Sequence, residues 1–440
     1  MEKIVLPEIP NYNQIDVYLA KGGFDSAKKA FAKTPDEIID EVKKSGLRGR
    51  GGAAFSAGLK WSFMPKTTDK PKYLAINGDE SEPGSFKDRQ ILEDNPYQLI
   101  EGAVITCYAI GAKVAYLYIR GEYHKWIKLM QKAVDEAYAR GFLGEKMRET
   151  FGINFSCDLY IHKGAGAYIC GEESSLMNSI EGLRGYPRVK PPFPAQCGLW
   201  GNPTTINNVE TITNVPAIIK NGWEWFSKIG TPKHPGTILF GISGHVNKPG
   251  VYELPSGILL TDLIYNVAGG VPDNKKIKCV IPGGSSMPPL RGDHLEGIRM
   301  DAESLREAGS AIGTGGVMVM DEETNLLKVL LRISHFYHHE SCGQCTPCRE
   351  GTGWMEKTLH RIDEGHGTSE DLDLLISIAT NIEGNTICAL GEAAAWPVRF
   401  MITRFRDEFE KYVKRDISIS VANKVHSMRE TAVPLVDIRK

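Results

Sequence analysis

The sequence contains no long apolar segment and no excess of positive charge. Its longest apolar runs, such as Ala103–Ala112, fall well short of the roughly 20 residues that a membrane-spanning helix needs. The 52 Lys and Arg residues are opposed by 54 Asp and Glu residues, so the net charge is −2 and no basic excess attracts nucleic acid or anionic lipid. Internal repeats and low-complexity segments are also missing. We therefore expect a globular protein that binds no nucleic acid and is not inserted directly into a membrane.

The cysteines do not fit a disulfide-bonded protein. Nine is an odd count, and outside one group near the carboxyl end they are scattered singly. Free cysteine is among the most often buried residue types, so we predict buried thiols at Cys107, Cys157, Cys170, Cys197 and Cys279. The segment Met1–Pro7 has neither the apolar core of a secretory signal nor the composition of a transit peptide. Both observations favour the reducing cytoplasm.

The chain is longer than one ordinary domain, and its pattern changes twice along its 440 residues. We expect three domains, at residues 1–236, 237–322 and 323–440. In the first, predicted strands alternate with predicted helices; the strands are Tyr73–Gly78, Val114–Ile119 and Cys157–His162, and the helices lie at 35–45, 96–111 and 123–140. A capping box at Thr34 and Glu37 is predicted to begin the first of these helices. This alternation predicts a mostly parallel sheet with crossover helices.

The second and third domains differ from the first. Two strands, Ile238–Gly244 and Gly250–Leu254, a short helix at Leu260–Val267 and a strand at Lys278–Ile281 predict a small α+β unit of the β-grasp type. From Thr324 onward the pattern is helical. A helix that leads to a cysteine-rich loop is followed by helices predicted at 371–382 and 392–413. We expect these helices to form a bundle.

Three cysteines follow one another as C-x-x-C-x-x-C, at Cys342, Cys345 and Cys348, and Cys388 is the one further cysteine downstream. Three thiolates on one loop can hold three corners of a [4Fe–4S] cluster, and Cys388 supplies the fourth. Arg349 follows the run, which indicates one isolated cluster and not a two-cluster ferredoxin. The alternatives are disulfides or a structural zinc site, which usually has two separated C-x-x-C pairs. His339 is an alternative fourth ligand.

Two segments have the composition of a nucleotide or flavin site. The segment Gly46–Gly58 has five glycines and two arginines, and such loops expose N–H groups that bind phosphate, although the P-loop pattern is absent. The segment Asn77–Arg89 begins at a strand end and contains four carboxylates, while Lys87 and Arg89 would oppose a bound cation. Hydrogen bonds to a flavin or a ribose are therefore favoured. The alternatives are a flexible connection and a solvated acidic turn.

Two more segments add to this pattern. Lys163–Glu173 runs from a strand toward a helix and is similar to a dinucleotide fingerprint, but its third glycine comes two positions late. Thr204–Glu210 is polar and is predicted to initiate a helix. Each segment is a weak signal alone. Four of them in one chain with an iron–sulfur motif indicate an electron-transferring flavoprotein.

With these motifs, the sequence from about residue 20 to 415 resembles the NADH-binding, FMN-carrying flavoprotein subunits of NADH:quinone oxidoreductase, respiratory complex I. Similar subunits occur in NAD-reducing hydrogenases and formate dehydrogenases, often with Cys-rich extensions that this chain lacks. The resemblance implies a Rossmann-like α/β domain for FMN and NADH. It also implies a β-grasp module of the soluble-ligand-binding type and a helical bundle that holds a [4Fe–4S] cluster.

The resemblance also implies roles for individual residues. Flavin-contacting positions match Gly49, Gly51, Lys60, Asn77, Asp79, Glu80, Tyr168, Gly171, Glu172, Asn207 and Asn208. Positions that hold the adenine match Phe55, Phe63 and Phe193, and a ribose contact matches Lys190. Carboxylates beside the nicotinamide, the catalytic positions, match Glu82 and Glu173. The cluster ligands match Cys342, Cys345, Cys348 and Cys388.

The implied activity is oxidation of NADH by hydride transfer to FMN, followed by transfer of single electrons to the [4Fe–4S] cluster of a quinone-reducing complex. The implied partners are a thioredoxin-like [2Fe–2S] subunit and a large multi-cluster Fe–S subunit, in the cytoplasmic peripheral arm of a membrane-bound complex. The alternatives are the equivalent subunit of a hydrogenase or formate dehydrogenase, and a non-catalytic, zinc-stabilised scaffold that binds a nucleotide.

The sequence departs from the family pattern at two places. Ala54-Phe55-Ser56-Ala57-Gly58 stands where the family usually has Gly-Phe-Pro-Thr-Gly, and Gly78 replaces a usual alanine. If residue 54 requires a positive φ, alanine there is strained by about 1 kcal/mol or more. The loss of proline also loosens the loop, and we expect both changes to affect how Phe55 is held.

Overall fold

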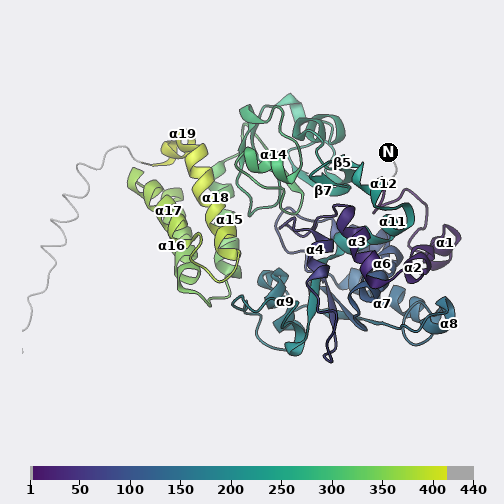
Figure 1. The fold of residues 1–440 in the computed structure, drawn as a ribbon. Helices are drawn as coiled ribbons and strands as arrows, with labels where there is room; N and C mark the ends of the chain where they lie inside the picture. Colours follow the sequence, from purple (N-terminus) through teal and green to yellow (C-terminus); the bar gives the residue numbers. More distant parts are fainter. Residues whose placement is uncertain (1–2, 414–440) are drawn as a thin grey trace, which may run out of the picture.

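The computed structural model describes residues 3–413, in three regions (Figure 1). The N-terminal region comprises residues 3–236, the middle region residues 237–325 and the helical region residues 326–413. The helical region, coloured yellow-green, lies beside the middle region and on the side opposite α1 and α2. The predicted third domain, 323–440, also includes residues 414–440, which lie outside the described residues. Within residues 3–413, no helix is both long and apolar enough to cross a membrane.

The N-terminal region is built around a four-stranded parallel sheet with the order β3-β2-β1-β4. Its strands are β1 (Tyr73–Gly78), β2 (Val114–Ile119), β3 (Asp158–Lys163) and β4 (Thr204–Asn208). Leu74 and Ile76 face α6 (Pro96–Ile110), which connects β1 to β2 and has 14 buried residues. On the other face, Ala75 shares an apolar cluster with Leu176 of α9 (Glu173–Ile180). Burial on both faces is typical of parallel sheets.

The remaining elements of this region are short, except for the 16-residue helix α7. They are α1 (Ile15–Ala20), α2 (Asp25–Phe31), α3 (Pro35–Lys44), α4 (Ala57–Ser62), α5 (Asp88–Asp94), α7 (His124–Ala139), α8 (Met147–Phe151), α10 (Val209–Thr213), α11 (Val215–Asn221), α12 (Trp223–Ser227), β5 (Gly230–Thr231) and β6 (His234–Pro235). The capping box predicted at Thr34 and Glu37 is present at the start of α3.

The predicted strands β1, β2 and β3 are confirmed, but the prediction for Thr204–Glu210 was incomplete. This polar segment first forms β4, which pairs with β1, and a helix begins only at Val209. The side chain of Asn208 accepts a hydrogen bond from the backbone N–H of Glu210 and so caps α10. Thr204, Thr205 and Ile206 favour a strand, and pairing with β1 extends it through Asn207 and Asn208, because strand formation depends strongly on tertiary context.

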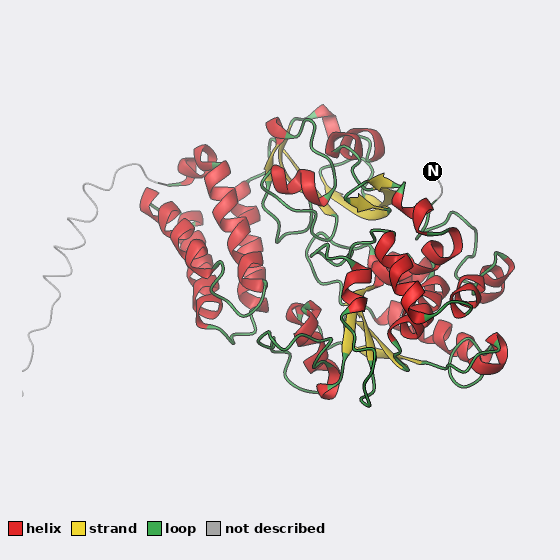
Figure 2. Cartoon of the chain, in the orientation of Figure 1, coloured by secondary structure: helices red, strands yellow, loops and turns green. Residues whose placement is uncertain are grey.

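The middle region contains a five-stranded mixed sheet with the order β10-β9-β11-β7-β8. Its strands are β7 (Thr237–Gly244), β8 (Gly250–Pro255), β9 (Ile277–Ile281), β10 (Leu290–Arg291) and β11 (Gly316–Asp321). The predicted helix at Leu260–Val267 consists of α13 (Leu260–Asp262) and a π-helical turn at Leu263–Val267. A further helix, α14 (Ala302–Glu307), packs near it through Leu305. Figure 2 shows the two sheets in separate parts of the molecule.

The helical region has one helix that the sequence pattern did not predict. Its elements are α15 (Leu326–Glu340), α16 (Thr346–Asp363), α17 (Ser369–Ile382), α18 (Leu390–Arg404) and α19 (Arg406–Phe409). The missing prediction is α16, which contains Gly351 and Gly353 and so has low helix propensity. A Cβ atom at Gly351 would approach Ile382 to 2.7 Å, so glycine permits the close packing of α16 on α17. The single helix predicted at 392–413 is broken at Phe405.

Candidate functional site

A cavity of about 520 Å³ opens where the three regions meet. The N-terminal region contributes the carboxyl ends of β1 and β4, through Asn77 and Asn208, together with residues 50–53, 79–88 and 168–172. The middle region contributes residues near Ser286 and Thr314, and the helical region contributes the first turns of α18. The carboxyl ends of parallel strands are the usual place for ligands in α/β folds.

The glycine-rich segment forms a narrow loop whose tip lines the cavity. The N–H of Gly49 donates to the carbonyl of Phe55 at 2.7 Å, which closes the base of the loop. A Cβ atom at Gly51 would approach the Cβ of Asn208 to 3.0 Å, so glycine permits this close approach to β4. Ala54 has a φ of 50°, so the condition under which alanine is strained at this position is met. At Gly78, an added Cβ would come within 2.9 Å of the Tyr118 carbonyl oxygen.

Two aromatic side chains next to this loop are exposed. Phe55 and Phe63 are 48% and 55% exposed, and their ring centroids lie 6.3 Å apart. Phe193 is 55% exposed in the segment after Pro191 and Pro192. Exposed aromatic rings offer flat apolar faces on which a nucleobase can stack. All three were predicted as adenine contacts, and they lie outside the residues that line the cavity.

Asp79 follows β1 and lines the cavity. Asn77 holds the backbone there, since its side-chain amide donates to Gly171 O at 2.8 Å and its oxygen accepts from the N–H of Asp79 at 2.9 Å. Burial raises the pKa of Asp79 to about 7, although the hydroxyl of Ser81 hydrogen-bonds to its carboxylate and opposes the rise. A carboxyl group with such a pKa is half protonated near neutral pH and can donate as well as accept a hydrogen bond.

Because the pKa of Asp79 is raised in the folded protein, we expect this residue to destabilise the fold as the pH rises. The folded state holds the proton more tightly than the unfolded chain between about pH 4 and pH 7, so stability falls over that interval. We therefore expect the free energy of unfolding of the FMN-free parent to fall between pH 5 and pH 8. In the FMN-free Asp79→Asn variant this fall should be smaller by about 2 kcal/mol. Denaturant titrations at both pH values measure this, and parallel losses in the two proteins would contradict it.

The structure uses two predicted flavin contacts in another way. The carboxylate of Glu80 accepts from the backbone N–H groups of Lys87 and Asp88, at 2.6 and 2.8 Å, and from the hydroxyl of Tyr123 at 3.0 Å. It therefore holds the start of α5, although Glu80 lines the cavity. The side-chain oxygen of Asn207 accepts from the indole N–H of Trp61 at 2.9 Å and lies buried outside the lining. Both side chains shape the site.

A group of opposite charges lies at the start of α9. Lys190 Nζ is 2.6 Å from a Glu173 oxygen and 3.1 Å from a Glu172 oxygen, and Lys60 Nζ is 2.9 Å from the other Glu173 oxygen. Although burial opposes ionisation, the two ammonium groups lower the pKa of Glu173 to about 2. Glu172 also caps α9 by accepting from the N–H of Ser174 and of Ser175. The structure thus brings together four residues that were predicted to belong to the site.

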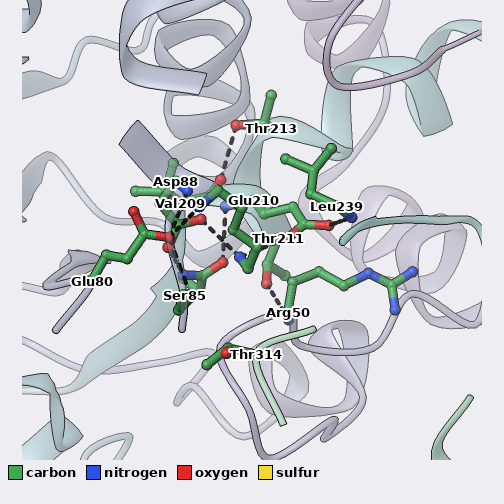
Figure 3. Close-up of polar contacts among 12 residues, drawn as sticks. Arg50, Glu80, Ser85, Asp88, Val209, Glu210, Thr211, Thr213, Leu239 and Thr314 are labelled. Atoms are coloured by element: carbon green, nitrogen blue, oxygen red, sulfur yellow. Dashed lines mark hydrogen bonds and ion pairs between the residues drawn. The ribbon is translucent and has the colours of Figure 1, made fainter. Parts of the chain in front are cut away.

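A buried ionic cluster of Lys87, Asp88 and Glu210 adjoins the cavity, whose lining includes Lys87 and Asp88. Figure 3 shows the polar contacts around Asp88 and Glu210. The ammonium of Lys87 is 2.7 Å from Glu210 and 2.8 Å from Asp88, and these three side chains are 2%, 0% and 6% exposed. Burial opposes the charge on Lys87, but the adjacent carboxylates of Asp88 and Glu210 raise its pKa above its usual value. Glu210 also accepts from the N–H of Leu239 in β7, at 2.9 Å. The sequence motifs did not identify Glu210 as a residue of the site. Its position two residues after the Asn207-Asn208 pair was the one signal that could have done so.

Arg50 joins the glycine-rich loop to the same cluster. Its backbone N–H donates to the hydroxyl of Thr211 at 2.9 Å, and its guanidinium donates to the carbonyl of Pro235 at 2.8 Å and contacts His234. Arg50 is almost fully buried. Arg50 thus joins the glycine-rich loop to α10 and β6, while Glu210 makes the contact with β7 of the middle region.

The four predicted cluster ligands lie at the starts of two helices. Cys345 is the N-cap of α16, Cys348 lies in its first turn, and Cys388 precedes Ala389, the N-cap of α18. Burial raises the pKa of Cys348 to about 11 and that of Cys388 to about 12. In both cases neighbouring thiols of the set, Cys342 among them, contribute to the rise. The positive ends of two helix dipoles favour an anionic group at this place.

This donor set fits an iron–sulfur cluster. In a cubane each iron binds one cysteine, so four thiols from two loops surround the cluster and do not converge on one ion. Among residues 3–413, no three His, Cys, Asp or Glu side chains are arranged to hold a single metal ion. The cavity lining includes Ala389 and Leu390, immediately after Cys388, so the cavity and the cysteine loops adjoin. Four sulfur donors and two helix starts are therefore available to a [4Fe–4S] group.

Three other cysteine and histidine predictions can be compared with the structure. Cys107, Cys157, Cys170 and Cys279 are buried free thiols as predicted. The prediction for Cys197 was wrong: it is exposed, because it lies in a surface turn where its N–H donates to the carbonyl of Phe193. His338 pairs with Glu356 at 2.5 Å, and His339, the alternative ligand, has a 76% exposed side chain beside Glu340.

Three family models match successive parts of the chain. Residues 42–217 match a Nuo51 FMN-binding domain, residues 239–319 match an SLBB domain, and residues 328–412 match an NADH-ubiquinone oxidoreductase-F iron-sulfur binding region. The fold and site therefore define a flavoprotein with a C-terminal [4Fe–4S] region. The match to an iron-sulfur binding region favours an iron–sulfur cluster over zinc. The match to an FMN-binding domain identifies the flavin as FMN.

Similar proteins include the F subunit of NADH-quinone oxidoreductase of Rickettsia typhi, 53% identical over 90% of this chain and 93% of the relative. Its counterpart in Rickettsia bellii is 52% identical over 89% of this chain and 94% of the relative. Among solved structures, the air-oxidized NAD+-reducing [NiFe]-hydrogenase matches with a TM-score of 0.81 and 35% identity, covering 92% of this chain and 68% of that chain. The chain belongs to the family of the F subunits of NADH-quinone oxidoreductase.

Proposed function

We propose that this protein oxidises NADH and delivers the electrons to a quinone-reducing complex to which it belongs. The observation that carries the proposal is the shared cavity, whose lining runs from the glycine-rich loop to the residue after Cys388. When bound, FMN supplies the conversion of a two-electron hydride donor into single electrons, which the [4Fe–4S] group accepts. The protein supplies binding, orientation and charge.

We assign the residues as follows. FMN is held by Gly49, Gly51, Lys60, Asn77, Asp79, Tyr168, Gly171, Glu172 and Asn208, while Glu80 and Asn207 shape its site. The nucleotide is held by Phe55, Phe63, Phe193 and Lys190, with Glu82 and Glu173 beside the nicotinamide. The cluster is held by Cys342, Cys345, Cys348 and Cys388. Lys60, Glu173 and Lys190 form one charged group next to Glu172. Nine of the assigned residues line the cavity: Gly51, Asn77, Asp79, Glu80, Glu82, Tyr168, Gly171, Glu172 and Asn208.

We also propose the finer description of the fold. A parallel sheet with crossover helices supports a Rossmann-like domain at 1–236, and the mixed sheet accompanied by α13 and α14 supports a β-grasp domain at 237–322. The helices that carry the cysteine loops support a cluster domain beginning at 323. Each boundary lies between elements, before β7 and before α15.

The proposed partners are a thioredoxin-like [2Fe–2S] subunit and a large multi-cluster Fe–S subunit, in the peripheral arm of a membrane-bound complex. Support comes from relatives named as F subunits of NADH-quinone oxidoreductase, at 53% identity. The hydrogenase structure is less similar in sequence, at 35% identity, so membership of a hydrogenase is the less favoured assignment.

The proposal is tested on protein purified with its small partner subunit. We expect about one FMN per chain, iron and acid-labile sulfide for a [4Fe–4S] cluster, and reduction of ferricyanide by NADH. Flavin fluorescence after denaturation and elemental analysis measure the cofactors. Zinc without iron, in protein that lacks NADH-dependent reduction, would overturn the proposal.

We expect a strong preference for NADH over NADPH. A 2′-phosphate needs a cationic partner, but the one lysine assigned to the ribose, Lys190, is already paired with Glu172 and Glu173. Placing a phosphate near those carboxylates costs several kcal/mol, which corresponds to about 100-fold or more in kcat/KM. Steady-state kinetics with both nucleotides measure the ratio of kcat/KM for NADH to kcat/KM for NADPH. Equal kcat/KM values for the two nucleotides would show that the adenosine lies elsewhere.

A further inference from the structure

Glu82 lies where all three regions meet. One carboxylate oxygen accepts from the backbone N–H of Ser286 at 2.7 Å and from the hydroxyl of Ser286 at 2.6 Å. The other accepts from the hydroxyl of Tyr168 at 2.7 Å. Tyr337 of α15 is more distant, at 3.4 Å. Two of the three short contacts to this predicted nicotinamide carboxylate therefore come from the middle region.

The backbone of the middle region is fitted closely to the turn that carries Glu82. The N–H of Ser285 donates to the carbonyl of Pro83 at 3.0 Å. Gly284 has a φ of 98°, and a Cβ atom there would come within 2.6 Å of Glu82 Cγ. Glycine therefore permits the Ser286 N–H and hydroxyl to reach the carboxylate. This fit sets the orientation of the Glu82 side chain.

The hydroxyls of two serines and two tyrosines donate to the carboxylate: Ser285, Ser286, Tyr168 and Tyr337. Burial and the negative charge of Glu82 raise the pKa of Tyr168 and of Tyr337 well above the usual value, so both phenols stay protonated. Ser286 is 7% exposed and lines the cavity. Hydrogen bonds to a charged acceptor with little access to water are stronger than ordinary ones.

We propose that Ser286 is a positioning residue that fixes the Glu82 carboxylate in the cavity, so that the middle region forms part of the nicotinamide site. This inference rests on the proposed function. A carboxylate beside the nicotinamide disfavours reduced, anionic flavin with NAD+ still bound, and so promotes release of NAD+. If the carboxylate is free to turn away, this effect weakens and NAD+ stays bound longer.

The test uses the full chain in its complex, loaded with FMN. Ser286→Ala should bind NAD+ to the reduced protein roughly fivefold to tenfold more tightly than the parent, as expected for one lost hydrogen bond to a charged group. Glu82→Gln should shift the affinity in the same direction. FMN content should not change in either variant. Ser286→Thr, which keeps a hydroxyl, should restore the parent value.

Ser310→Ala is a matched control. Ser310 lies in the same region with the same 7% exposure, and its hydroxyl donates to the carbonyl of Pro288 at 2.6 Å, away from Glu82. Its NAD+ affinity should equal that of the parent. The double variant Ser286→Ala/Glu82→Gln should show no more than the effect of Glu82→Gln alone, because Ser286 acts through Glu82.

The outcomes separate the two proposals. If the parent oxidises NADH but Ser286→Ala leaves NAD+ affinity unchanged, or adds fully to Glu82→Gln, the positioning role is overturned and the proposed function stands. A parent without FMN or NADH oxidation overturns both. Should Ser286→Ala not fold, Ser286→Gly, which keeps the backbone N–H and lacks the hydroxyl, must show the same tighter binding.

Discussion

Replacing Cys388 with alanine is expected to abolish the paramagnetic signal of the reduced [4Fe–4S] cluster, while NADH still reduces the flavin. Cys388 lies on a different loop from the other three cysteines, but it immediately precedes the N-cap of α18, next to the cavity. Without a fourth thiolate the cluster loses one corner ligand. Electron paramagnetic resonance after dithionite reduction measures the cluster, and flavin bleaching by NADH measures the first step.

The controls for this result come from the same chain. Cys197→Ala should leave the signal unchanged, because Cys197 is exposed in a surface turn of the N-terminal region. Cys345→Ala should lose the signal as Cys388→Ala does. A full signal in Cys388→Ala would show that another residue, such as His339, closes the cluster. Loss of flavin reduction together with the signal would show that Cys388 also supports the flavin site.

The second large effect is expected from Glu210→Ala. This change leaves the Lys87 ammonium, which is 2% exposed, beside Asp88 alone, and it removes the acceptor for the N–H of Leu239. Breaking a buried ion pair by removing one partner costs about 3–5 kcal/mol, because an incompletely compensated charge stays buried. We expect the denaturant midpoint of the transition involving the N-terminal and middle regions to fall accordingly, and FMN to be released more readily.

Two further variants identify the cause. Lys87→Met combined with Glu210→Met and Asp88→Asn removes all three charges and should regain much of the lost stability. Removing the exposed pair of Lys66 and Asp36, whose side chains are 76% and 62% exposed, should have little effect. A Glu210→Ala protein as stable as the parent would show that water reaches Lys87. Chemical denaturation followed by tryptophan fluorescence and by FMN release measures both properties.

The sequence alone determined what depends on local spacing. The cysteine run and Cys388 indicated a [4Fe–4S] cluster because ligand type and spacing are set by a few residues, and the family matches confirm the cofactor. Strands β1, β2 and β3 and the capping box at Thr34 were predicted because hydrophobic runs and caps act within one element. The glycine-rich loop was recognised in the same way, and the strained φ at Ala54 was anticipated from one residue.

Only the tertiary structure decided features that depend on distant partners. Strand β4 exists because β1 offers it a parallel neighbour, and α16 tolerates its glycines because Ile382 of α17 packs against Gly351. Glu80 and Glu210 look alike in sequence as acidic residues near polar motifs, but one holds α5 and the other neutralises Lys87. Their roles follow from burial, because a carboxylate removed from water takes whichever donors the fold brings to it. The contact between Glu82 and Ser286 joins residues 204 positions apart, and chain folding alone brings them together.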